Sequence, residues 1–171
     1  MSIQTNTPKT LSLAAILSLG MLAGHGAVQA EEPGIAGRKV GETIFATIDT
    51  NGRGWIHAGD LEQFRALVFV GMDADDNQAV NFNEFSSWDP GFAYVAEQMG
   101  RSDAYLTASK IVFSFWDRNG NDALTESEMR FAMTSDFRRA DVDDDSLLTQ
   151  EEFLQGFPIM VAMRAALRPD P

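Results

Sequence analysis

Apolar residues recur every three or four positions through most of the chain from residue 40 to residue 167, which is the spacing of amphipathic helices. In one stretch these residues are Leu61, Phe64 and Val68, and in another they are Met129 and Met133. Short polar segments rich in Asp and Asn separate the apolar stretches. We therefore expect an all-α protein whose helices span residues 36–48, 61–72, 91–99, 102–116, 129–140, 151–156 and 159–167.

Several of these expected helices begin or end at residues that favour such positions. Asp89 and Pro90 are typical of an N-cap and a first helical residue. Gly100 is typical of the residue that ends a helix. Ser102 or Asp103 is expected to cap the helix that follows.

Four of the polar segments share one twelve-residue pattern. Each begins with Asp, carries oxygen-bearing side chains at positions 3, 5 and 12, and has a branched apolar residue at position 8, with Arg53 as the exception at position 5. An aromatic residue stands four positions before each segment. The segments are 49–60, 73–84, 117–128 and 141–152, and the aromatic residues are Phe45, Phe69, Phe113 and Phe137.

Alternate oxygen donors in a curled loop are what a hard cation such as calcium needs, because it collects six to eight oxygens. The four segments resemble the calcium-binding loops of the EF-hand superfamily, and the resemblance covers most of residues 31–171. It implies helix-loop-helix units that bind Ca²⁺. It also implies that loops pair through the backbone at position 8, occupied here by Ile56, Val80, Leu124 and Leu148.

The spacing of the four segments predicts which of them pair. Asp49 and Asp73 are 24 residues apart, as are Asp117 and Asp141, whereas Asp73 and Asp117 are 44 apart, so the chain is a duplicated two-loop unit. Only twelve residues separate the loops within a unit, which is room for one helix of about 18 Å. That helix is shared, so its two loops lie at opposite ends of it. If the two shared helices are antiparallel, the second loop pairs with the third and the first with the fourth.

The loops differ in the charge that they offer a cation, and we expect the fourth, with four carboxylates, to bind most tightly. The predicted ligands are Asp141, Asp143, Asp145, the Leu147 carbonyl and Glu152; Asp73, Asp75, Asn77, the Ala79 carbonyl and Glu84; Asp117, Asn119, Asn121, the Ala123 carbonyl and Glu128; and Asp49, Asn51 and Asp60. Arg53 puts a cation where a ligand belongs, and Asp60 is one methylene too short for easy bidentate binding. We therefore rank the first loop last.

Position 6 of such a loop turns sharply with φ > 0 and normally takes glycine. Only the first loop has one there, Gly54, whereas the others carry Gln78, Asp122 and Ser146. A non-glycine residue in that conformation costs about 1–2 kcal/mol. Such sites suit a compartment rich in calcium.

The first thirty residues are typical of a secretory signal peptide. Lys9 precedes an apolar run from Leu11 to Ala23, and Val28 and Ala30 stand at −3 and −1 of an expected cleavage before Glu31. We expect a mature domain of residues 31–171 in a bacterial periplasm or outside the cell, with no membrane contact after cleavage.

Charge and composition narrow the function further. Residues 31–171 hold 12 Lys and Arg against 25 Asp and Glu, a net charge of −13, which repels nucleic acid and favours metal ions as partners. There is no cysteine, and the clustered carboxylates are accounted for as ligands, so we expect no enzyme.

Two alternatives to a calcium buffer or structural protein stay open. The close loop spacing is similar to that of the lanmodulin family of periplasmic lanthanide-binding proteins, which implies lanthanide ions as ligands; the family's Pro at position 2 and Asp at position 9 are absent here. A calmodulin-like module would bind a protein target through an apolar face containing methionines. We prefer core packing for these residues, which are Met129, Met133, Met160 and Met163.

Overall fold

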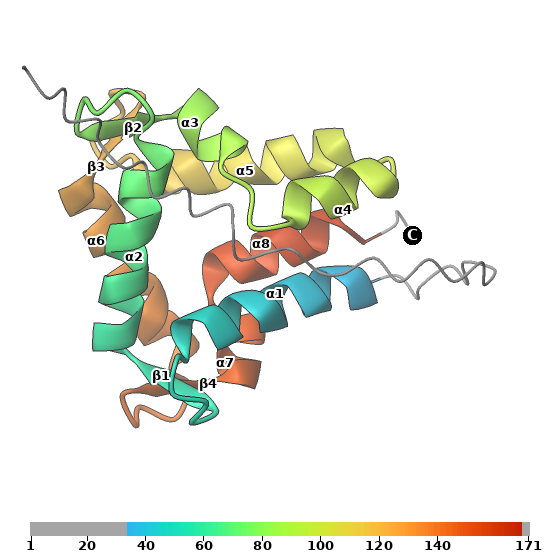
Figure 1. Ribbon diagram of the computed structural model, residues 1–171, viewed down its shortest axis with the longest axis vertical. Coiled ribbons are helices and arrows are strands. Elements are labelled where there is room, and N and C mark those ends of the chain that lie inside the picture. Colours follow the sequence, from blue (N-terminus) through green and yellow to red (C-terminus); the bar gives the residue numbers. More distant parts are fainter. Residues whose placement is uncertain (1–33, 169–171) are drawn as a thin grey trace, which may run out of the picture.

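The computed structural model describes residues 34–168, so the expected signal peptide at residues 1–30 lies outside the described part. Within that part the chain is mostly helical, with two small antiparallel sheets (Figure 1). In chain order the elements are α1 (Ile35–Ile48), β1 (Trp55–His57), α2 (Ala58–Met72), β2 (Ala79–Asn81), α3 (Phe82–Ser87), α4 (Phe92–Gln98), α5 (Ser102–Trp116), β3 (Ala123–Thr125), α6 (Glu126–Ala140), β4 (Leu147–Thr149), α7 (Gln150–Gly156) and α8 (Pro158–Ala166).

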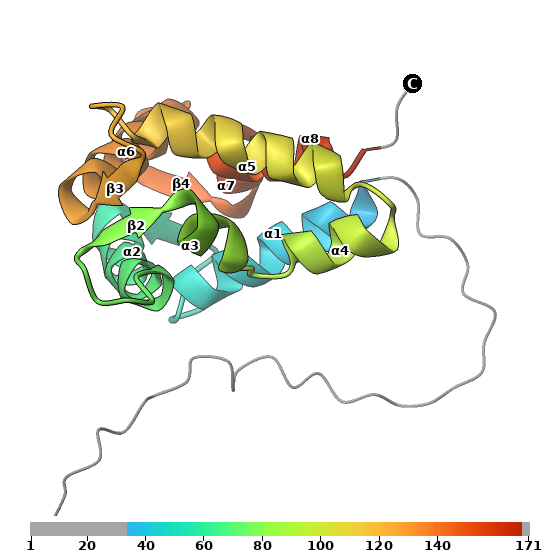
Figure 2. The ribbon, with the colours of Figure 1, turned by 90° about the horizontal axis from the view of Figure 1, so that it is seen from above.

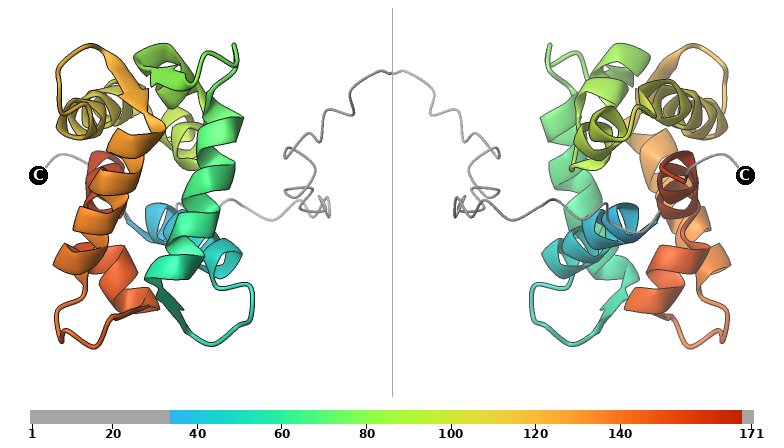
Figure 3. Two further views of the ribbon diagram at one scale, coloured as in Figure 1. Left: turned by 90° about the vertical axis from the view of Figure 1, so that its left-hand side faces the viewer. Right: turned by 90° about the vertical axis from the view of Figure 1, so that its right-hand side faces the viewer.

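The helices α2 and α6 lie side by side and antiparallel, with one small sheet at each end of the pair (Figure 3). At one end β1 pairs with β4, and Ile56 faces Leu148 in the register. At the other end β2 pairs with β3, and Val80 faces Leu124. The strands therefore join the first twelve-residue segment to the fourth and the second to the third, which is the order that the spacing predicted.

The remaining helices cover one side of the α2 and α6 pair and complete the core (Figures 1 and 2). The last helix, α8, packs against α5, α7 and α1. Phe153 of α7 stacks on Phe157 with ring centroids 5.2 Å apart and meets Phe45 of α1 at 5.7 Å. These contacts bring residues from both ends of the described chain into one core.

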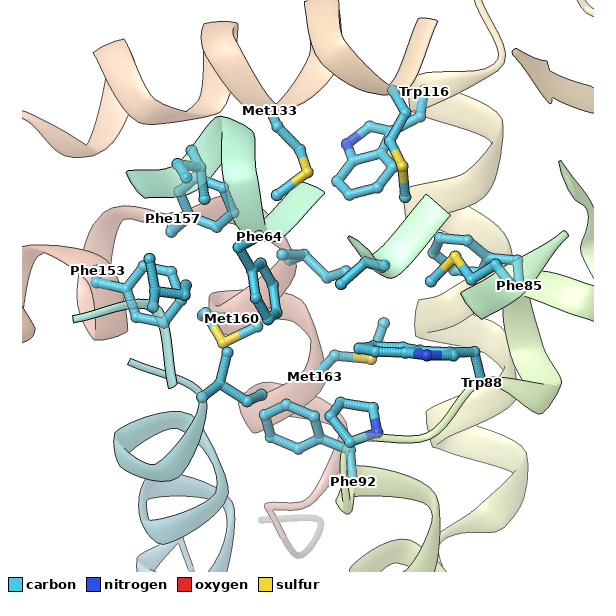
Figure 4. Close-up of a pocket in the computed structure, with 18 of the residues that line it drawn as sticks. Phe64, Phe85, Trp88, Phe92, Trp116, Met133, Phe153, Phe157, Met160 and Met163 are labelled. Carbon is cyan, nitrogen blue, oxygen red and sulfur yellow. The ribbon is translucent and has the colours of Figure 1, made fainter. Parts of the chain in front are cut away.

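The methionines of the expected apolar face lie in this core. Met129, Met133, Met160 and Met163 are all buried, and they line an apolar cavity of about 70 Å³ together with aromatic side chains such as Phe64 (Figure 4). A cavity of this size has no room for a peptide helix. The burial of these residues agrees with core packing, which is the role that we preferred for them.

Several helix boundaries differ from the expected ones. The helices that leave the loops begin inside them, so α2 starts at Ala58 and α6 at Glu126, each three residues earlier than predicted. The short helix α3 was not predicted at all. Neither Ser102 nor Asp103 caps α5, because its N-cap is Arg101, which makes no side-chain capping hydrogen bond. Gly100 does end α4, at a φ of 65°.

Pro90 is not the first residue of α4, and the helix expected over 91–99 begins at Phe92, with Gly91 as its N-cap. Asp89 is therefore not the N-cap that we expected, but its carboxylate accepts hydrogen bonds from the backbone N–H groups of Gly91, Ala93 and Tyr94 at 2.9–3.2 Å. Among residues 34–168 no helix has the length and apolar character needed to cross a membrane.

Candidate metal centre

Two of the four loops gather three carboxylates each. Oxygens of Asp73, Asp75 and Glu84 all lie within 4.8 Å of one another in the second loop. In the fourth loop the same holds for Asp141, Asp143 and Asp145. Like charges this close repel one another unless a cation or hydrogen-bond donors offset them. The two loops predicted to carry the most charge therefore bring their charges together.

The first Asp of each loop holds the loop in its curled shape. The carboxylate of Asp73 accepts from the N–H groups of Asn77 and Gln78 at 3.0 and 2.9 Å. In the fourth loop Asp141 accepts from the backbone of positions 5 and 6 in the same way, at 3.1 Å each. These hydrogen bonds tie the carboxylate at position 1 to the backbone of positions 5 and 6, and so fix it within the loop.

The backbone turns with φ > 0 at position 6 in all four loops, as predicted. The φ values are 80° at Gly54, 68° at Gln78, 63° at Asp122 and 67° at Ser146. A positive φ also occurs at position 4 of every loop, which sequence reasoning did not anticipate: the residues are Gly52, Asp76, Gly120 and Asp144, with φ between 57° and 69°. Glycine, Asp and Asn tolerate this conformation best, so the composition of position 4 suits its role.

The acidic residue at position 12 belongs both to the loop and to the helix that follows. Glu84 accepts from the N–H of Ala74 at position 2 and from the N–H of Asn81 at position 9, both at 2.9 Å. Glu152 accepts in the same manner from Val142 at 3.3 Å and from the N–H and hydroxyl of Thr149 at 2.9 and 2.8 Å. Each glutamate thus closes its loop from position 2 to position 9.

This arrangement is a capping box, in which position 9 is the N-cap of the exit helix and position 12 is its third residue. Burial alone would raise the pKa of Glu152, but hydrogen bonds from Thr149 and Val142 outweigh it and lower the pKa. The N-cap role of Asn81, Thr125 and Thr149 was missed from the sequence. The Thr-x-x-Glu spacing of a capping box was the available signal.

The predicted side-chain ligands of the third loop are two carboxylates and two amides. Asp117 accepts from the N–H groups of Gly120, Asn121 and Asp122 at 2.9–3.2 Å. Glu128 accepts from the side-chain amide of Asn119 at 2.8 Å and from Thr125. The predicted ligands of this loop are therefore adjacent, and they carry two negative charges against four for the predicted ligands of the fourth loop.

In the first loop two of the three predicted ligands, Asp49 and Asp60, contact Arg53. Its guanidinium donates to Asp60, and its Nε lies 3.6 Å from Asp49. Burial opposes the charge on both carboxylates. Backbone hydrogen bonds and Arg53 outweigh it, so the pKa of Asp49 and that of Asp60 are lowered. Asn51 is exposed in the turn.

The predicted backbone ligands at position 7 are the first residues of strands. Ala79, Ala123 and Leu147 begin β2, β3 and β4, and each donates its N–H to the side-chain oxygen at position 5, at 2.8, 3.0 and 2.8 Å. These hydrogen bonds fix the side chains of Asn77, Asn121 and Asp145 inside their loops.

Comparison with known proteins does not assign these loops to a family. A scan of the chain against protein-family models found no match, and a search of curated proteins found no significantly similar sequence. A metal site is therefore inferred from the geometry of the chain itself. It has four curled loops, two of which gather three carboxylates, and short antiparallel strands hold the loops in two pairs.

Proposed function

We propose that this protein binds calcium ions through the second, third and fourth loops, each acting as an EF-hand-type site, with loops paired 1–4 and 2–3. The observation that carries the proposal is the convergence of three carboxylates within 4.8 Å in the second and fourth loops. It is supported by the curled backbone, in which the first Asp of a loop accepts N–H groups from positions 5 and 6.

The donor set favours calcium over other common ions. Carboxylate, amide and backbone oxygens suit hard cations, and the chain offers no thiolate for softer metals. Magnesium requires near-ideal octahedral geometry and gives up its water reluctantly, which suits a flexible twelve-residue loop poorly. Lanthanide ions share the preference for oxygen and are the competitor that an experiment must separate from calcium.

The strained turn at position 6 points to modest affinity. Gln78 and Ser146 both adopt a positive φ that costs a non-glycine residue about 1–2 kcal/mol. Sites weakened in this way suit surroundings where calcium is abundant, such as the extracellular side of a membrane. We therefore propose a role as a calcium buffer or calcium-stabilised structural protein outside the cytoplasm.

Isothermal calorimetry with calcium tests the proposal. We expect saturable binding below millimolar calcium, with Glu152→Gln removing the tightest event and Asp60→Asn leaving it nearly unchanged. Circular dichroism in chelator should show a lower melting temperature than in calcium, because the ion offsets repulsion among the loop carboxylates. Absence of heat and of any stability change at millimolar calcium would rule the function out, and competition with lanthanum decides between the two ion classes.

A further inference from the structure

The guanidinium of Arg53 occupies the place in the first loop where a bound cation would lie. Its Nη2 donates to Oδ2 of Asp60 at position 12, and its Nε lies 3.6 Å from Oδ1 of Asp49 at position 1. Asp49 also accepts from the backbone N–H groups of Arg53 and Gly54 at 3.0 and 2.7 Å. One side chain therefore links the first and last acidic residues of the loop.

This ion pair is shielded from solvent. The side chains of Asp49, Asp60 and Arg53 are 5%, 13% and 24% exposed. The Cζ of Arg53 lies 4.1 Å from the centre of the Trp55 ring, which covers one face of the guanidinium. Charges in such surroundings are weakly screened, so Arg53 repels a second cation strongly.

In the other three loops the residue at position 5 offers an oxygen instead of a positive charge. Asn77, Asn121 and Asp145 each present a side-chain oxygen there, held by the N–H at position 7. These loops need an external cation to offset their acidic residues, whereas the first loop carries its own. The difference matters beyond the first loop, because β1 pairs with β4 of the fourth loop over three residues (Figure 3).

We propose that Arg53 is a positioning residue that acts as the resident cation of the first loop. It excludes metal from that loop and, through the β1 and β4 ladder, holds the fourth loop in its paired form before metal arrives. The second and third loops have no such partner, so their ladder forms together with metal binding. The part of this inference that concerns the fourth site rests on the proposed function.

Hydrogen exchange of the full chain in chelator tests whether Arg53 holds the β1 and β4 ladder without metal. We expect residues 55–57 and 147–149 to exchange about tenfold or more slowly than residues 79–81 and 123–125, because an internal ion pair closes only the first ladder. Arg53→Gln should remove this difference and Arg53→Lys should restore part of it. Arg118→Gln is the matched control, since Arg118 lies at position 2 of the third loop and stacks on Phe131. Equal exchange of both ladders in the wild type, or full protection in Arg53→Gln, overturns the inference.

Equilibrium dialysis with calcium tests the exclusion of metal. The wild type should bind three ions. Arg53→Asn combined with Asp60→Glu gives the first loop the same donor types at positions 1, 3, 5 and 12 as the third loop, and it should bind a fourth ion, whereas Asp60→Glu alone should not. Four ions on the wild type or on Asp60→Glu, or three on the double variant, contradict the role of Arg53. Failure of all three proteins to bind calcium removes the proposed function instead, and the exchange experiment then still decides whether Arg53 holds the ladder.

Discussion

The indole Nε1 of Trp116 donates a hydrogen bond to Oδ2 of Asp136, 3.2 Å away, across the contact between α5 and α6. Both side chains are buried, and Arg139 reaches the other carboxylate oxygen at 3.0 Å. Burial raises the pKa of Asp136, and the donors only partly offset it. The folded protein therefore keeps a proton on Asp136 to higher pH than the unfolded chain does.

Asp136→Asn should accordingly stabilise the protein near neutral pH. A raised folded-state pKa means that the contribution of Asp136 to stability is fully present at low pH and is lost as the pH rises through that pKa. The melting temperatures of the two proteins should differ least at the acidic end of the range, where the carboxyl is mostly protonated in both states, and the melting temperature of the variant should rise above that of the wild type as the pH rises. Melting curves in chelator from pH 3.5 to 7.5 measure this. The exposed Asp103→Asn is the control, and a less stable Asp136→Asn at pH 7 would refute the argument.

Glycine at position 6 of the second loop should tighten metal binding. Gln78 holds a φ of 68°, and Gln78→Gly removes the steric cost of that conformation. We expect affinity at this site to rise about tenfold, which corresponds to the 1–2 kcal/mol cost of a left-handed residue. Gln78→Ala removes the same side-chain amide but keeps the strain, so it should show no gain. An equal gain in both variants would mean that the amide, not the backbone, limits binding.

Arg65 and Arg130 contact the same two carboxylates, Glu62 and Glu126, but differ in burial. The side chain of Arg65 is 1% exposed and that of Arg130 is 51% exposed. Arg65→Gln should therefore lower the unfolding free energy by about 2 kcal/mol, as expected for lost buried charged hydrogen bonds. Arg130→Gln should lower it by less than about 1 kcal/mol. Urea unfolding of both variants tests the ranking, and equal losses would show that burial does not set the strength of these pairs.

Gly156 allows α7 to approach α6 closely. A Cβ at this position would lie 2.8 Å from the Cα of Ala140, which is backbone and cannot rotate away. Gly156→Ala should destabilise the protein by about 1–3 kcal/mol through overpacking. Gly37→Ala is the comparison, because its Cβ would most closely meet a side chain and not backbone, at 3.1 Å from Cδ1 of Leu167. Thermal melting should show a larger loss for the first variant than for the second.

The sequence predicted every described helix except α3, and it predicted the partners of the strands, because both follow from spacing. One helix of about twelve residues cannot turn back on itself, so the loops at its ends had to find partners elsewhere. The positive φ of Gln78, Asp122 and Ser146 was likewise predictable, since the loop curls at a fixed position.

Other features depend on distances that a sequence does not contain. Arg53 could be recognised as an obstacle to metal binding, but its reach to both Asp49 and Asp60 depends on how the loop folds. The starts of α2 and α6 were placed three residues late because each helix was expected to begin after position 12 of its loop, whereas position 9 is its N-cap. Nothing in the sequence indicated that Asp136 is buried, because its burial arises where α6 packs against α5 at Trp116.

The unbroken helix α2 connects the two ends of the protein directly. Its 15 residues extend about 22 Å, from the β1 strand at one end to Asp73 at the other. A twist of α2 at either sheet is carried to the opposite sheet, and α6 runs beside it in the reverse direction. The two sheets therefore do not belong to two separate lobes. Within residues 34–168 a reorientation of α2 at one end also moves the sheet at the other end.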